Sequence, residues 1–201
     1  MKCLFIASLV LPLQYAAVRA DNVTLPDKDT DEGLLARLLI AESLTPNRAQ
    51  YDADSVKKGM RAMKAAVDNR LKNKPAQFGA PNAKNYVDIV GAAGQFAGFS
   101  KNAGKIVISS EVQARIDDVL KKANSGKPGK YAAFVENSIA VAKNPVDDPF
   151  KDVKKIGTVE VLGGSFGWRP VDKGSPGGNF LAIPASQGGI VGGNQFYSVK
   201  K

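Results

Sequence analysis

The 201-residue sequence contains no histidine and a single cysteine, Cys3. The missing imidazole excludes Ser-His-Asp and Cys-His catalysis and most zinc sites. Cys3 precedes the part of the chain that we expect to fold, so that part has no thiol, no disulfide and no cysteine metal ligand. We therefore expect neither a metal nor another cofactor, and any chemistry must rest on carboxylates, Lys, Tyr, Ser or Thr.

The N-terminus has the pattern of a cleavable export signal. Lys2 supplies a positive start, residues 4–13 are apolar apart from one Ser and one Pro, and residues 18–20 end on a small side chain. The apolar run is well short of the roughly 20 residues that a membrane-spanning helix needs. We expect cleavage after Ala20 and a mature protein that is periplasmic or secreted.

The mature chain of about 180 residues is long enough for one globular domain with its own core. Residues 21–31 are polar and acidic, which predicts a flexible lead-in, and residues 32–201 form the expected domain. The formal charge is +9, and removal of Lys2 and Arg19 leaves +7. This charge favours anionic envelope polymers or membrane surfaces over nucleic acid, although solubility alone explains it equally well. We expect a monomer that binds no nucleic acid.

Two long helices are predicted in the first half of the chain. Residues 32–43 repeat apolar side chains every three or four positions, and residues 55–73 do the same behind Ser55, a favourable N-cap. Beside the apolar stripe of the second helix runs a row of small residues, which predicts the close approach of another helix: Gly59, Ala62, Ala66 and Asn69.

The rest of the chain predicts shorter helices and then strands. A loop over residues 75–81 leads to a short helix over 85–93, and Ser110 with Gln113 predicts a capped helix that continues to Gly126. A further helix follows Tyr131 and ends before Pro145. From Gly157 onward the composition favours loops with short strands near residues 158–162 and 180–183. The predicted class is mainly α, or α+β.

Glu42 is the strongest candidate for a catalytic residue. It follows Leu35 and Leu38 on the apolar stripe of the first helix, so partial burial would raise the pKa of its carboxyl group, as a general acid requires. The alternative is a solvated helix-end residue, free or paired with Arg48. Asn69 and Arg70 could orient such a carboxylate or hold a substrate, and they could equally be surface residues.

Two pairs of amide and aromatic side chains suit a sugar ligand. Gln95 precedes Phe96 in a Gly-flanked loop, and Asn194 lies close to Phe196 and Tyr197 near the C-terminus. Sugar rings are often held by an aromatic face together with amide hydrogen bonds. The alternative for each pair is a core aromatic residue beside an exposed amide.

Together these segments resemble the motifs of the cell wall hydrolases typified by the spore cortex-lytic enzyme SleB. Residues 36–42 resemble the first motif and place its catalytic glutamate at Glu42. Residues 59–70, closing with Asn-Arg, match the second motif, and residues 87–96, closing with Gln-Phe, match the third. The resemblance returns at residues 192–197, where Asn194 replaces a histidine of the family. Residues 43–46 replace a small residue, a Gly and another Glu.

The resemblance implies a lysozyme-like helical fold whose Gly-rich C-terminal segment completes a groove. It also implies cleavage of peptidoglycan glycan strands between N-acetylmuramic acid and N-acetylglucosamine. Glu42 would protonate the glycosidic oxygen, and capture by water or by the muramic acid's own hydroxyl would distinguish a hydrolase from a lytic transglycosylase. One carboxyl suffices in the latter case, and Asp88 and Glu111 are the nearest candidates for a second.

Two other functions are consistent with the same residues. The changes after Glu42 and at Asn194 favour a non-catalytic protein that binds peptidoglycan or organises an envelope assembly. A secreted antibacterial toxin would use the same chemistry and would have a protein inhibitor as its partner.

Overall fold

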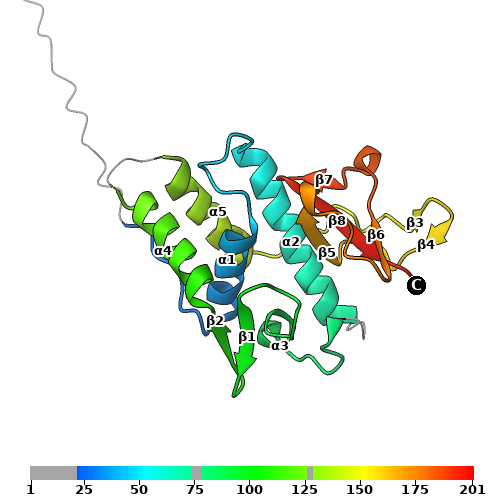
Figure 1. Ribbon diagram of the computed structural model, residues 1–201, viewed down its shortest axis with the longest axis horizontal. Coiled ribbons are helices and arrows are strands. Elements are labelled where there is room, and N and C mark those ends of the chain that lie inside the picture. The colour runs from blue at the N-terminus through cyan, green and yellow to red at the C-terminus, as the bar shows by residue number, and fades with distance from the viewer. Residues whose placement is uncertain (1–21, 74–77, 126–128) are drawn as a thin grey trace, which may run out of the picture.

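Helix α1 (Asp31–Glu42) lies among the other helices of the chain (Figure 1). The structure is a computed structural model that describes residues 22–73, 78–125 and 129–201, so the predicted export signal lies outside the described residues. Helix α1 contacts four other helices: α2 (Ala53–Asn73), α3 (Tyr86–Val90), α4 (Ser110–Ala123) and α5 (Lys130–Lys143). Because neighbours surround it, α1 is buried on several sides instead of along one stripe, with Leu34, Leu38 and Ile40 fully buried.

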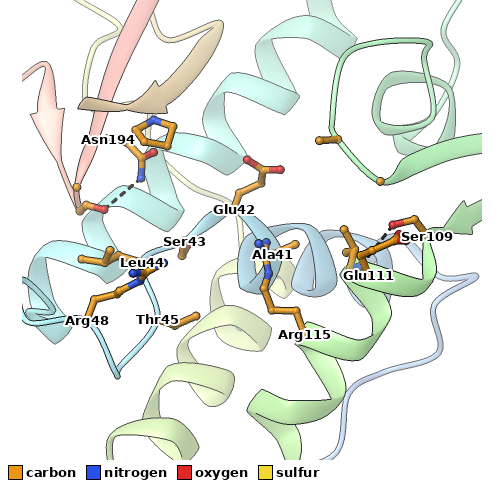
Figure 2. Close-up of a pocket in the computed structure, with 16 residues that line it drawn as sticks. Ala41, Glu42, Ser43, Leu44, Thr45, Arg48, Ser109, Glu111, Arg115 and Asn194 are labelled. Atoms are coloured by element: carbon orange, nitrogen blue, oxygen red, sulfur yellow. Dashed lines mark hydrogen bonds between the residues drawn. The ribbon is translucent and has the colours of Figure 1, made fainter. Parts of the chain in front are cut away.

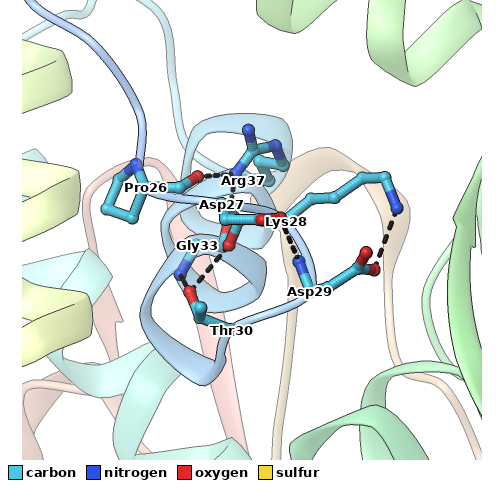
Figure 3. A network of polar contacts seen from close by, with 7 residues as sticks. All are labelled: Pro26, Asp27, Lys28, Asp29, Thr30, Gly33 and Arg37. Carbon is cyan, nitrogen blue, oxygen red and sulfur yellow. Dashed lines mark hydrogen bonds and ion pairs between the residues drawn. The ribbon is translucent and has the colours of Figure 1, made fainter.

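The segment before α1 is held against the domain by specific contacts (Figure 3). The Arg37 guanidinium donates to the carbonyl oxygens of Pro26, at 2.6 Å, and Gly33, at 2.9 Å. Thr30 caps α1 by accepting a hydrogen bond from the Gly33 N–H. A Cβ atom at Gly33 would lie 1.9 Å from the Asp27 carbonyl oxygen, so this approach requires glycine. The described part of the lead-in, predicted to be flexible, therefore packs as part of the domain.

Helix α2 presents two different faces to its neighbours. Met60 faces α5, where the Ser138 hydroxyl donates to the Met60 sulfur at 3.7 Å. The row of small residues faces the C-terminal sheet, since Gly59 lies against the backbone of Gly192. The prediction that a helix covers this row is thus wrong: a sheet covers it. Asp52, not Ser55, caps α2 by accepting from the Ser55 N–H.

A β-hairpin that the sequence analysis missed lies between α3 and α4. Strands β1 (Phe99–Asn102) and β2 (Lys105–Ile108) pair antiparallel and contact α3 through β1. Helix α4 follows directly and is capped by Ser109, one residue before the predicted cap Ser110. The hairpin sends the chain out and back, so that α4 begins close to the end of α1.

The C-terminal part of the chain forms small antiparallel sheets against α2 (Figure 1). Strand β8 (Asn194–Val199) is central and pairs with β5 (Gly167–Pro170), β6 (Phe180–Ala182) and β7 (Ile190–Val191). A separate ribbon joins β3 (Lys155–Ile156) to β4 (Val159–Glu160). The strands predicted near residues 158–162 and 180–183 correspond to β4 and β6.

The fold belongs to the mixed α+β class: the α-helices and the β1–β2 hairpin lie before Pro145, and the other sheets follow it. Most of the buried apolar side chains belong to one core that runs from the helices to Phe196 of β8. A smaller cluster joins Phe78, Phe166 and Val199, with Phe180 of β6 packed against it. Among the described residues, no helix combines the length and the apolar character that crossing a membrane requires.

Candidate active site

Glu42 is the last residue of α1 and its carboxyl group points into a cleft (Figure 2). Removal from solvent is the largest influence on this group and raises the pKa of Glu42 above that of a free glutamate. The Trp168 indole N–H, which donates to Glu42 Oε2 at 3.4 Å, and the charges of Arg115 and Arg70 act in the opposite direction. The carboxyl group is therefore partly shielded from water and biased toward its protonated form.

The cleft around Glu42 has a volume of about 580 Å³. One wall comes from the end of α1 and the following loop, which carries Leu44 and Arg48. A second wall is the start of α4 with Glu111 and Arg115, and Gly-rich residues 192–194 close the third side. Three distant parts of the sequence thus meet at one carboxyl group, as Figure 2 shows.

Trp168 is a neighbour of Glu42 that the sequence did not point to. Its ring lies between Phe96 and Phe196, with centroid distances of 5.4 and 6.5 Å. Both phenylalanines are buried, so they support Trp168 from within the core instead of offering an open face to a sugar. Strand β5 directs the indole toward Glu42, which lies 126 positions earlier in the sequence. The only sequence signal was that Trp168 is the single tryptophan of the chain.

Arg70 is buried behind the site. Its Nε donates to the Phe166 carbonyl oxygen at 2.6 Å and one terminal nitrogen donates to Gln95 Oε1 at 3.3 Å. The guanidinium also lies over the rings of Phe78 and Phe96, at 4.2 and 4.9 Å. Burial lowers the pKa of Arg70 to about 9, against the influence of Glu42, which leaves it cationic at neutral pH. Arg70 therefore lies where its charge acts on Glu42, and its burial favours the predicted orienting role over direct contact with a substrate.

Hydrogen bonds from Asn69 link α2 to the segment before β5. Its Nδ2 donates to Asp148 Oδ2 at 2.6 Å and to the Ser165 carbonyl oxygen at 2.9 Å. The same Asp148 oxygen accepts from the Ser165 N–H at 2.8 Å. These bonds occupy both hydrogens of the Asn69 amide group, and Asn69 does not line the cleft around Glu42.

The residues predicted near the C-terminus separate onto the two faces of β8. Successive side chains of a strand point to opposite faces, so Asn194 and Phe196 share one face and Tyr197 lies on the other. Tyr197 donates to the Gly174 carbonyl oxygen at 3.1 Å and packs edge-on against Phe180, away from Glu42. Asn194 alone of the three lines the cleft.

Comparison with protein families, curated proteins and solved structures found no match. The proposed function below therefore rests on the geometry of the site and on the sequence motifs.

The two carboxylates suggested as a second catalytic group have different positions. Asp88 forms an ion pair with Lys101 at 2.7 Å and does not line the cleft. Glu111 lines it from the first turn of α4, where backbone N–H groups and the hydroxyls of Ser109 and Ser110 lower the pKa of its carboxyl group. Glu42 and Glu111 thus face one cleft with their pKa values shifted in opposite directions. No cluster of three potential metal ligands occurs within residues 22–73, 78–125 and 129–201.

Proposed function

We propose that the protein cleaves peptidoglycan glycan strands between N-acetylmuramic acid and N-acetylglucosamine, with Glu42 as the general acid. The observation that carries this proposal is a shielded carboxyl group with a raised pKa that faces an open cleft. A carboxyl group in this state holds its proton to higher pH than a free glutamate and can deliver it to a glycosidic oxygen. The cleft is open at its surface, as a polymeric substrate requires.

The positions of the motif residues support the proposal. Glu42, Arg70 and Phe96 come from three separate motifs that resemble those of the cell wall hydrolases, and all three meet around Trp168 or Glu42. The arrangement of helices around α1, with a sheet completing the cleft, is consistent with a lysozyme-like fold, which is part of this proposal.

The neighbours of Glu42 suit both halves of the reaction. Glu42 would transfer its proton to the leaving oxygen as the glycosidic bond breaks and an oxocarbenium-like centre forms. The carboxylate left behind is stabilised by the Trp168 N–H and by the charges of Arg115 and Arg70. It would then take a proton from the attacking oxygen, either of water or of a muramic acid hydroxyl, so a single carboxyl group serves both steps.

The proposal is tested by digesting purified sacculi and analysing the fragments by mass spectrometry. Wild-type protein should release muropeptides with either reducing or anhydro ends, which separates hydrolase from lytic transglycosylase. Glu42→Gln should lower the rate about 10²-fold or more, because Gln keeps the shape but has no acidic proton. Glu136→Gln, at an exposed glutamate of α5 outside the cleft, is the matched control. Retention of more than about a tenth of the activity by Glu42→Gln would refute the assignment.

A non-catalytic peptidoglycan-binding protein is the second candidate. Asn194 lies in the cleft where the resembled family has a histidine, which favours this alternative. It would be supported if wild-type protein co-sedimented with sacculi and released no fragments after long incubation.

Both candidates share the proposal that residues 1–20 direct export. Fractionation of the producing cells, with N-terminal sequencing of the recovered protein, should place it outside the cytoplasm beginning at Asp21. Recovery in the cytoplasm with an intact Met1 would contradict this.

A further inference from the structure

Two arginines line the Glu42 cleft without forming an ion pair to any described carboxylate. Arg48 lies in the loop after α1 and Arg115 on α4, and both side chains are exposed. Figure 2 shows them on the same side of Glu42, flanking the end of α1. Glu111 lies one helical turn before Arg115, but its carboxylate interacts with the N-terminus of α4. The cleft therefore holds two cations that are available to a ligand.

Asn194 adds a buried acceptor to the same cleft. Its side chain is only 3% exposed, and its Nδ2 donates to the Gly192 carbonyl oxygen at 3.1 Å. Its Oδ1 accepts no hydrogen bond from the described residues. A buried oxygen without a donor is costly, so a ligand N–H or O–H group that reaches Asn194 Oδ1 when the amide turns toward the cleft would gain a full hydrogen bond.

We propose that Arg48 and Arg115 bind a carboxylate of the glycan while Asn194 Oδ1 accepts from an acetamido N–H or a hydroxyl group. The cleft would then select acidic N-acetylated strands over neutral ones. This inference rests on the proposed function only in taking a glycan as the ligand. The planar fork of a guanidinium matches a carboxylate, which supports the choice of ligand group. Peptidoglycan offers the lactyl carboxylate of muramic acid, free on strands without stem peptides, and the carboxylates of the stem peptides themselves.

The test measures binding in the Glu42→Gln background, so that no probe is consumed. The probes are glycan strands freed of stem peptides, intact peptidoglycan fragments of the same sugar length, and neutral N-acetylglucosamine oligomers. Calorimetry should give at least one acidic probe about tenfold tighter binding than the neutral oligomer, since hydrogen bonds to charged groups exceed neutral ones. Which acidic probe binds tighter identifies the lactyl or the stem-peptide carboxylate.

The double substitution Arg48→Gln with Arg115→Gln should remove this preference and leave binding of the neutral oligomer unchanged. The matched control is Lys57→Gln with Lys121→Gln, which removes the same charge from exposed positions outside the cleft. Asn194→Asp should weaken binding of all probes, because a second acceptor replaces the donor to Gly192 and a buried charge is added. Thermal melts confirm that each variant is folded.

The inference is overturned if acidic and neutral probes bind equally, or if the control pair loses the preference as fully as the arginine pair. Binding of none of the probes also overturns it. Fragment release from sacculi tests the proposed function separately. Cleavage without a preference for acidic strands would reject only the arginine site, and a preference without cleavage would reject only the enzymatic proposal.

Discussion

Replacing Glu42 by Gln should stabilise the protein near neutral pH, even as it removes the proposed activity. Burial raises the pKa of Glu42 in the folded state above its value in the unfolded chain. Above this raised pKa the carboxyl group is charged in both states, and the folded state alone incurs the cost of shielding the charge from water. As the pH falls to the range where the unfolded chain is also protonated, that cost disappears. The stabilisation by Gln should therefore be present at neutral pH and vanish in acid.

The expected gain is about 0.5 to 2 kcal/mol, the usual range for a single stabilising substitution. For a domain of this size, each kcal/mol raises Tm by about 2–4 °C. Gln also keeps an oxygen that can accept from the Trp168 N–H. The gain in stability thus reports the removal of the charge alone, because the contact with Trp168 is kept.

The assay is differential scanning calorimetry of wild type and variant near pH 7 and near pH 3, on either side of ordinary carboxyl titration. Glu111→Gln is the control, because the pKa of this exposed carboxyl is lowered and its removal should not stabilise the fold. A Glu42→Gln variant that melts at or below the wild-type temperature near neutral pH would refute the reasoning. A gain that persists undiminished in acid would do the same.

Three further outcomes follow from particular contacts. Trp168→Phe keeps the ring stack but removes the N–H that lowers the pKa of Glu42. In the pH profile of sacculus digestion, the alkaline limb should therefore move to higher pH, and an unchanged or lower limb would contradict this. In denaturant titration, Gly33→Ala should destabilise the fold by about 1–3 kcal/mol, because its Cβ would overlap the Asp27 carbonyl. Gly59→Ala, which has room for a Cβ in α2, should be neutral or stabilising. Equal effects of the two substitutions would refute the packing at Gly33. Digestion of metal-free sacculi should proceed at full rate in EDTA. Loss of activity that added zinc restores would show a metal-dependent mechanism in place of proton donation by Glu42.

Local patterns in the sequence predicted the helices and the principal candidate residue. Apolar periodicity and capping side chains act over a few residues, so they located the helices to within a few positions of their ends. The apolar surroundings of Glu42 on its own helix predicted a raised pKa on condition that the carboxyl group was partly buried, and the fold met that condition. Residues 157–201 were also correctly predicted as short strands and loops, because Gly and Pro punctuate them.

Which residues reach Glu42 was decided only by tertiary packing. Trp168 approaches from a strand 126 positions away, and no local pattern links the two. The small-residue row on α2 predicted a close neighbour, but only the folded chain showed that this neighbour is a sheet. A glycine such as Gly59 leaves room for the backbone of a helix or of a strand, so the sequence did not distinguish the two. The alternation of β8 separated Tyr197 from Asn194, because the register with β5 sets which face of the strand meets the cleft. Periodicity shows that a residue is buried, whereas contacts between distant segments decide what it is buried against.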